Sequence, residues 1–284
     1  MKKYDLHKND YSKLHFELKA ISPFFSRNKE KASKPHRHSF FQLLWFRESG
    51  RHYIDYKVFE HPRNSLFLIN KNQVHYFCPD SSNKGYLFHF NDSFISKFNL
   101  DLLSRFSVSI FNEFLQPFIN FTNDQSQKIE DTVKILLKEL EQKNENYEDV
   151  VMHFFLGFLF QIERINKAQQ NTSFSTNSDF KKIVEFKQLI LDKIDQNLGI
   201  QSIADSLSIS SKKLTSITKA HTSLTPANLI KELKILEAKR MLSNHNISIK
   251  EVAYSLGFDQ PTYFTKFFKK EVQLTPKEFQ KSIL

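Results

Sequence analysis

Hydrophobic and polar residues form short runs in the first third of the chain, and later recur at helical spacing. Between residues 20 and 95, turn-forming sequences separate five β-rich segments: 40–46, 51–59, 65–70, 74–78 and 85–90. Short strands at nearly regular spacing are typical of an antiparallel barrel or sandwich. The first part of the chain is therefore predicted to be an antiparallel β domain.

Two amphipathic helices are predicted after these strands, at 129–142 and 149–165. The first has one apolar stripe, with charged residues opposite, formed by Ile129, Val133, Leu136, Leu137 and Leu140. Such stripes are suited to covering the open end of a barrel. Neither helix is a sustained heptad repeat, so the pattern leaves the oligomeric state open.

A change of composition follows the helices. The stretch 166–179 is rich in Gln, Asn, Ser and Thr and contains one aromatic residue, which is typical of a linker. Every segment after it has helical periodicity. The chain is therefore divided into a β domain at 1–125, a helical region at 126–166, a linker at 167–179 and a helical domain at 180–284.

The last of these segments contains the same unit twice. Residues 199–207 align with 248–256, and both carry apolar residues at positions i, i+3, i+4 and i+7. Shifted by one residue, 214–226 aligns with 264–276, so that Leu-Thr-Pro recurs at an offset of 50. The sequence therefore predicts one supersecondary unit that occurs twice.

The second copy predicts two helices joined by a short turn. Ser248 begins a capping box, and Gly257 lies where a helix would end in the left-handed conformation. Asp259 or Gln260 can cap the next helix, and Pro261 is tolerated in its first turn. This order of helix, short turn and helix is the signature of a helix-turn-helix motif.

The second helix of this copy has two different faces. Its apolar stripe consists of Phe264, Phe267, Phe268 and Val272. Its polar stripe consists of Thr262, Thr265, Lys266 and Lys269. Thr can contact base edges or a thymine methyl group, and Lys can reach guanine or phosphate. A merely solvated helix face has the same composition, so the duplication, the short turn and the charge must decide between the two interpretations.

The net charge of +10 favours DNA, because it is concentrated beside these motifs. Residues 180–284 contain 17 Lys and Arg against 10 Asp and Glu, a net charge of +7, and the first 179 residues carry the other +3. A basic excess there indicates a polyanionic partner, nucleic acid before membrane.

The residues expected to contact duplex DNA lie on both copies. In the first copy they are Lys212, Thr215, Ser216 and Lys219, and in the second Gln260, Pro261 and Tyr263 join the polar stripe. A connecting helix at 227–244 would be roughly 25 Å long. With the width of the two motifs added, the second helices can enter successive major grooves about 34 Å apart.

Cysteine usage and hydropathy exclude several classes of protein. The single Cys78 excludes an intramolecular disulfide and a zinc site with several Cys ligands. It has no His or Arg beside it, which disfavours a methyl-accepting thiol of the DNA-repair type. No run of about 18 apolar residues exists, and the N-terminus lacks the apolar stretch of a signal peptide. A cytoplasmic protein without a membrane partner is expected.

The segment 198–284 resembles the DNA-binding domain of the AraC/XylS transcription regulators, which has two helix-turn-helix motifs joined by a long helix. The resemblance rests on residues 249–279, which contain Ile-x-x-Val-Ala, Leu-Gly-Phe, Tyr-Phe-x-x-x-Phe-Lys and a late Thr-Pro. The first copy departs from the family, because Ser216 and Thr218 stand where Arg and Phe are usual. The resemblance implies that the helices at 126–165 form a dimerisation region.

Residues 34–50 and 64–77 resemble the cupin-like sensory domain that is often fused to this module. Metal-binding cupins use a His-x-His pair, a Glu four residues later and a distant His, which correspond here to His36, His38, Gln42 and His75. Gln removes the anionic ligand that a hard divalent metal favours, so neither a metal nor a cofactor is predicted. These four residues and Trp45 are predicted to bind an effector, with buried histidines that bind nothing as the alternative.

Together these observations predict a multi-domain α+β protein. An N-terminal antiparallel cupin-like β-barrel with following helices would sense an effector or dimerise, and an all-α domain would bind DNA through two helix-turn-helix motifs. The expected function is transcription regulation, not catalysis. A cupin-type metal enzyme and a regulator controlled by a protein partner are the alternatives. Expected partners are double-stranded operator or promoter DNA, a small-molecule effector, RNA polymerase and a second copy of the chain.

Overall fold

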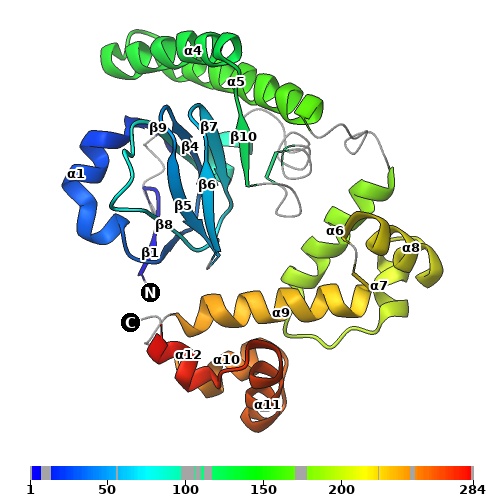
Figure 1. Cartoon of the computed structure of the whole chain (residues 1–284). Coiled ribbons are helices and arrows are strands. Elements are labelled where there is room, and N and C mark those ends of the chain that lie inside the picture. The colour runs from blue at the N-terminus through cyan, green and yellow to red at the C-terminus, as the bar shows by residue number, and fades with distance from the viewer. Residues whose placement is uncertain are drawn as a thin grey trace. The chain divides into compact units, whose positions relative to one another are not determined.

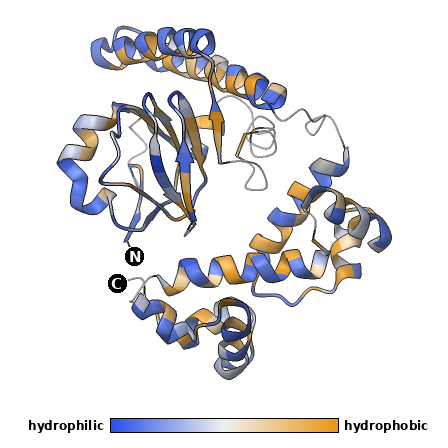
Figure 2. Ribbon diagram, in the orientation of Figure 1, coloured by the Kyte–Doolittle hydropathy of each residue, from blue (hydrophilic) through white to orange (hydrophobic). Residues whose placement is uncertain are grey.

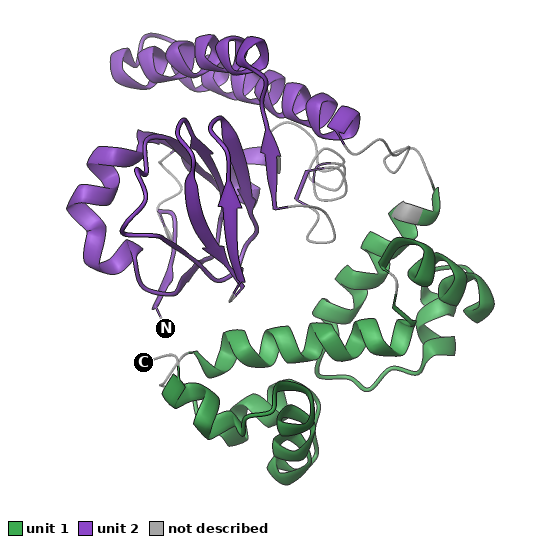
Figure 3. Ribbon diagram, in the orientation of Figure 1, with its two compact units in different colours: residues 1, 174–284 green, residues 2–173 purple. Residues whose placement is uncertain are grey.

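The chain forms two compact units, residues 2–173 and residues 174–284 together with residue 1 (Figure 3). The structure is a computed structural model, and it describes residues 2–7, 14–55, 57–96, 106, 110–111, 117–169, 178–222, 224–243 and 247–282. The first unit combines β-sheets with helices, and the second is helical (Figure 1). The predicted linker 167–179 lies largely outside the described residues.

Two five-stranded sheets build the first unit. One has the order β1-β3-β8-β5-β6, formed by Lys2–Tyr4, His36–His38, His75–Phe77, Gly50–Ile54 and Lys57–His61. The other has the order β10-β7-β4-β9-β2, formed by Phe118–Asn120, Ser65–Ile69, Phe41–Phe46, Gly85–Phe90 and Phe16–Ala20. Among the described residues every strand pair is antiparallel except β1 with β3, which is parallel. The predicted antiparallel β domain is confirmed, with this one exception.

One predicted strand is in fact a hairpin. The segment 51–59 forms β5 and β6, with His52 opposite Phe59 and Tyr53 opposite Val58. The chain reverses at Asp55, whose φ of 45° is left-handed. Asp tolerates this conformation better than most residues, and no Gly or Pro marks the turn in the sequence. The alternating pattern of residues 51–59 therefore does not reveal that the chain reverses direction within them.

A helix also interrupts the strand-rich region. The 12-residue helix α1 (Ile21–Ala32) follows β2, and its buried residues are Ile21, Phe25 and Ala32. Two short elements, α2 (Asp92–Ser96) and β10, follow β9. The apolar positions of α1 are too few to show a helical stripe, so its burial against the sheets decides its place.

The strand β4 is buried on both faces. Phe41, Leu43 and Trp45 belong to an outer cluster shared with α4 (Asn123–Gln142) and α5 (Tyr147–Gln169). Its other face belongs to an inner cluster between the sheets, with Leu44, Phe46, Phe67 and Phe77. Both helices therefore cover the outer face of one sheet, and Figure 2 shows hydrophobic residues recurring along them. A strand covered on both faces reads as a continuous apolar run.

The second unit consists of α-helices. They are α6 (Ser178–Asp192), α7 (Ile200–Ser206), α8 (Ser211–Thr222), α9 (Pro226–Leu242), α10 (Ile249–Ser255), α11 (Pro261–Val272) and α12 (Pro276–Ser282). The repeat corresponds to α7–α8 and α10–α11, and α9 joins the two copies (Figure 1). The predicted pair of helix-turn-helix motifs on a long helix is confirmed.

The two turns have the same hydrogen-bonded form. The amide of Ile209 donates to the carbonyl oxygen of Ala204, and the amide of Phe258 donates to that of Ala253, each at 3.0 Å. The left-handed residue is Ser208 in the first turn, with φ 55°, and Gly257 in the second, with φ 78°. A Cβ at Gly257 would lie 2.2 Å from the carbonyl oxygen of Asp195, so only glycine fits there without a shift.

No helix within the described ranges is both long and apolar enough to cross a membrane.

Candidate DNA interface and histidine pocket

The helix α11 presents a basic face opposite its core stripe. Phe264 and Phe268 are fully buried, and Phe267 and Val272 are partly buried. Its exposed residues are Thr262, Tyr263, Lys266, Lys269 and Lys270. Gln260 is exposed just before the helix, and Pro261 is half-buried at its first position. The sequence prediction did not include Lys270, which extends the basic face.

The helix α8 presents the corresponding face of the first copy. Leu214 and Ile217 point into the core as predicted, and Thr218 is also fully buried. The exposed residues are Lys212, Lys213, Ser216, Lys219 and Ala220. Lys213 differs from the other lysines because its Nζ lies 2.6 Å from a carboxylate oxygen of Asp179.

The two predicted threonines occupy equivalent positions. Each is half-buried, and its hydroxyl donates to the carbonyl four residues earlier at 2.9 Å, Thr215 to Ser211 and Thr265 to Pro261. The hydroxyl proton of each threonine is therefore already engaged in a hydrogen bond within its own helix. Contact with a base from either residue would come through the methyl group or through the hydroxyl oxygen as an acceptor.

Five of the exposed lysines retain an unpaired charge. They form no ion pair with another residue that the structure describes: Lys212, Lys219, Lys266, Lys269 and Lys270. Phosphate neutralisation by such side chains releases counterions and supplies most of the affinity of non-specific DNA binding. Both second helices therefore offer positive charge on an exposed face.

A buried lysine connects the turn of the second copy with the loop before the first. Lys234 of α9 donates to Asn197 at 2.9 Å and to the carbonyl of Leu256 at 3.0 Å. Asn197 donates in turn to the carbonyl of Gly257 at 2.8 Å. Burial lowers the pKa of Lys234 from its ordinary value. These contacts hold the turn of the second copy and the loop before the first against α9.

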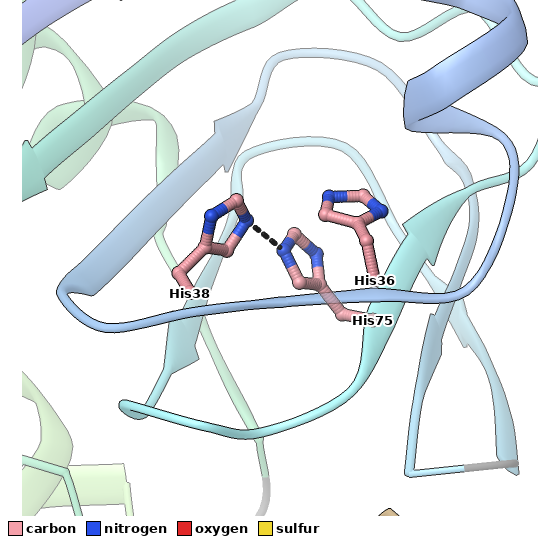
Figure 4. Close-up of side chains that lie close together, drawn as sticks. All are labelled: His36, His38 and His75. Atoms are coloured by element: carbon pink, nitrogen blue, oxygen red, sulfur yellow. Dashed lines mark hydrogen bonds between the residues drawn. The ribbon is translucent and has the colours of Figure 1, made fainter. Parts of the chain in front are cut away.

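The first unit contains a second group of polar residues, six buried histidines that face the space between the sheets. They are His36, His38, His52, His61 and His75 from one sheet and His89 from the other. His36 lies directly opposite His75 across β3 and β8. One ring nitrogen from each of His36, His38 and His75 lies within 4.8 Å of the other two (Figure 4).

Hydrogen bonds connect several of these rings. Nδ1 of His36 donates to the carbonyl of Lys34 at 2.8 Å. Nε2 of His75 lies 2.8 Å from Nε2 of His38, and its Nδ1 lies 3.2 Å from Nε2 of His52. At the two ends of this chain, Nδ1 of His38 and Nδ1 of His52 have no partner among the described residues.

Burial keeps this cluster in the neutral form. It lowers the pKa of His38, His52 and His75 well below the ordinary histidine value, and neighbouring histidines add to the effect. Burial also lowers the pKa of His36, against a raising contribution from its bond to Lys34. Neutral imidazole keeps one nitrogen lone pair, which can accept a hydrogen bond or bind a metal.

Gln42 belongs to a neighbouring chain of hydrogen bonds. Its amide nitrogen lies 2.8 Å from Nε2 of His89, and Nδ1 of His89 lies 3.2 Å from the carboxylate of Glu17. Burial alone would raise the pKa of Glu17, but hydrogen bonds from His89 and Lys19 lower it to about 2. With Glu17 ionised, His89 donates to it and accepts from Gln42. Oε1 of Gln42 is then left without a partner among the described residues.

A pocket of about 250 Å³ opens beside this cluster. The residues around it include Tyr4, Glu17, Phe24, Asn28, Lys31, His36, His38 and His89. Trp45, which the sequence grouped with these histidines, instead lies on the outer face of its sheet, because residues 42 and 45 point to opposite sides of one strand. Sequence reasoning missed Glu17 and His52, which come from strands that only the fold brings together.

Two family models match the chain. Residues 203–282 match a helix-turn-helix domain, so the second unit is a DNA-binding module by class. Residues 19–128 match an AraC-like ligand binding domain. The chain belongs to the AraC/XylS type, with this ligand binding domain in front of the helix-turn-helix domain.

Individual relatives cover parts of this arrangement. The HTH-type transcriptional activator RhaS of Enterobacter sp. (strain 638) is 24% identical over 148 residues, 52% of this chain and 53% of that protein. Histidine kinase P4 of Formosa agariphila is 30% identical over 95 residues, 34% of this chain and 7% of that protein. The chain therefore spans about half of one relative and a small part of the other. A structure of ToxT from Vibrio cholerae covers 95% of this chain and 99% of its own, with 17% identity and a TM-score of 0.45.

Proposed function

We propose that the protein is a sequence-specific DNA-binding transcription regulator whose N-terminal unit controls how it engages DNA. The observation that carries the proposal is the pair of equivalent helices, α8 and α11, each with unpaired exposed lysines on the face opposite its core stripe. A helix of this kind in a helix-turn-helix motif lies in the major groove.

The duplication determines how the DNA would be read. The helix α9 has 17 residues, which corresponds to roughly 25 Å, and each motif adds its own width. The helices α8 and α11 would enter successive major grooves on one side of the duplex. The second copy would supply most of the base contacts, because α11 exposes Thr262, Tyr263 and three lysines.

The N-terminal unit would bind a small effector in the pocket lined by His36, His38 and His89, the last of which holds Gln42, or join two copies through α4 and α5. Ile135 and Phe154 are exposed on these helices, at 39% and 40%. RNA polymerase would be the further partner at a promoter. We place the protein in the cytoplasm at the nucleoid, where its DNA target lies, and assign it no enzymatic activity.

The decisive measurement is the affinity of the full chain for duplexes selected from a random library, over a salt series. Lys266→Ala should weaken binding to all sequences and reduce the salt slope by about 1. Thr265→Ala should mainly reduce discrimination between sequences, by about 1–3 kcal/mol. The matched control is Lys57→Ala, which removes an exposed lysine of β6 in the other unit. If the double variant with Thr265→Ala and Lys266→Ala binds the selected duplex as tightly as the unmodified protein, the proposal is contradicted.

A further inference from the structure

The buried lysine of α9 lies where the two helix-turn-helix copies come together. We propose that Lys234 is a positioning residue: through Asn197 and the turn before α11, it holds α8 and α11 at a fixed distance and angle. It thereby sets the spacing between the two DNA segments that the protein recognises. The inference rests on the proposed DNA-binding function and names the residue that fixes the register of the two contacts.

Both partners of Lys234 belong to segments that position a DNA-facing helix. Asn197 lies two residues before Gly199, the N-cap of α7, and α7 leads into α8. Leu256 ends α10, and Gly257 follows it in the turn that leads into α11. Lys234 donates to Asn197 and to the carbonyl of Leu256, and Asn197 donates to the carbonyl of Gly257. These bonds therefore connect the start of the first copy with the turn of the second.

The backbones of the two segments also touch. A Cβ at Gly257 would lie 2.2 Å from the carbonyl oxygen of Asp195, so the turn packs directly on the loop before α7. Both copies pack on α9 as well, through α8 in the first and through α10 and α11 in the second. Hydrophobic packing is not directional, whereas hydrogen bonds have preferred distances and angles. The polar joint is therefore the contact that can fix the angle between the copies.

The burial of an ammonium group makes this joint costly to disturb. Lys234 is 9% exposed, and its bonds to Asn197 and Leu256 use two of the three protons on Nζ. Nζ also lies 5.5 Å from the centre of the Phe258 ring, which belongs to the same turn. A shift of either copy would take a partner away from a buried charge, which costs more free energy than the loss of a surface bond. One arrangement of the two copies is therefore favoured.

Duplex DNA converts this rigidity into a preference for one spacing. Successive major grooves face one side of the duplex at intervals of about 34 Å, or about 10 base pairs. One base pair inserted between the two contacted segments shifts the second by about 3.4 Å and rotates it by roughly 35°. Helices held rigidly cannot follow this change, so α8 or α11 loses its contacts. Helices on a loose joint can follow it, but their ordering on binding costs affinity for the original duplex.

The competing explanation is that the bridge only satisfies buried polar groups. The test measures the affinity of the full chain for the selected duplex and for the same duplex with one base pair inserted between the two segments that footprinting locates. For the unmodified protein the insertion should weaken binding at least about tenfold. In Lys234→Met, which removes the charge but keeps a long side chain, and in Asn197→Ala the penalty should fall to about threefold or less. A merely structural defect would weaken binding to both duplexes equally.

Two controls make the result specific. Gln196→Ala changes the exposed neighbour of Asn197 in the same loop and should keep the full penalty for the insertion. Lys234→Met should keep the salt slope of the unmodified protein, because a buried lysine neutralises no phosphate, in contrast to Lys266. Asn197 is itself exposed, so Asn197→Ala leaves the core unchanged. A full penalty in both Lys234→Met and Asn197→Ala overturns the proposal.

A measurement without DNA separates this proposal from the DNA-binding function. Spin labels attached at Ser216→Cys in α8 and Thr262→Cys in α11 of the full chain report the distance between the two helices, and the native Cys78 is buried away from the label. The distances should form one narrow distribution with Lys234 and a broader one in Lys234→Met. Equal widths overturn the proposal, whereas failure to select any duplex contradicts the DNA-binding function and leaves the label distances to decide on Lys234.

Discussion

In the second helix-turn-helix copy, a capping box starts the first helix and a glycine ends it, whereas the first copy has the same backbone without either. The second helices show the reverse, because Gln260 makes no side-chain cap bond before α11, contrary to the predicted cap, while the hydroxyl of Ser210 caps α8. Ser248 and Glu251 exchange both hydrogen bonds of a capping box at the start of α10. The corresponding helix of the first copy starts after Gly199, which has no side chain to cap it. The left-handed turn residue is Gly257 in one copy and Ser208 in the other.

The cores of the two copies differ as well, and the larger buried side chain lies in the second copy. Phe268 and Thr218 occupy equivalent positions and are both fully buried. Phe268 packs against Phe264 and Phe279, while the hydroxyl of Thr218 donates to the carbonyl of Leu214. A further helix packs on each copy, α6 against α8 in the first and α12 against α11 in the second. The same backbone is therefore filled by an aromatic cluster in one copy and by a smaller, hydrogen-bonded side chain in the other.

The largest expected effect comes from giving the second core the residue of the first. Phe268→Thr removes a buried ring that packs against two others, which should cost about 3–5 kcal/mol. Native-state hydrogen exchange of the α10–α12 amides in the full chain measures the loss. The amides of α7 should change much less, and a loss below about 1 kcal/mol in α10–α12 would contradict the comparison.

Exchanging the turn glycine should have the next largest effect. Gly257→Ala places a Cβ 2.2 Å from the carbonyl oxygen of Asp195 and adds the cost of a left-handed residue with a side chain, together about 2–4 kcal/mol. Ser208→Ala is the matched control, because that position already holds a side chain at positive φ and should lose under about 1 kcal/mol. The opening free energies of the two turns, measured by hydrogen exchange, should differ accordingly. Equal losses at the two positions would show that the contact with Asp195 has no special role.

Removal of the capping box should have a smaller effect. Ser248→Ala leaves the amide of Glu251 without its acceptor and should destabilise α10 by about 1 kcal/mol. Gly199→Ser tests the reverse change in the first copy and should gain a few tenths of a kcal/mol, since a Cβ there meets no atom within 4 Å. Amide exchange in the first turns of α10 and α7 measures both. Destabilisation by Gly199→Ser would contradict the comparison of the two helix starts.

The smallest expected effect is a gain. Ser208→Gly relieves the left-handed strain of the first turn but makes the unfolded chain more flexible, so we expect a net stabilisation of about 0.5 kcal/mol. Exchange of the α7–α8 amides reports it. A net loss would show that the surrounding helices already accommodate the side chain of Ser208 without strain.

The histidine pocket shows how far a sequence pattern reaches. His36, His38 and His75 were grouped from the sequence, and the structure brings them together because β3 and β8 pair directly. The two-residue period of a strand already separates Trp45 from Gln42, since an odd spacing places side chains on opposite faces. Glu17 meets His89 only through the pairing of β2 with β9, which joins strands about 70 residues apart.

The sequence by itself determined the features that depend on neighbouring residues: the capping box and turn of the second copy, the two faces of α11, and the strands β4, β7 and β9. These follow from backbone preferences and side-chain periodicity within one element. Tertiary structure decided the turn at Asp55, the place of α1, the parallel pairing of β1 with β3, and which histidines meet. Each depends on contacts between distant segments, whose register is set by burial of a whole sheet face and not by local pattern.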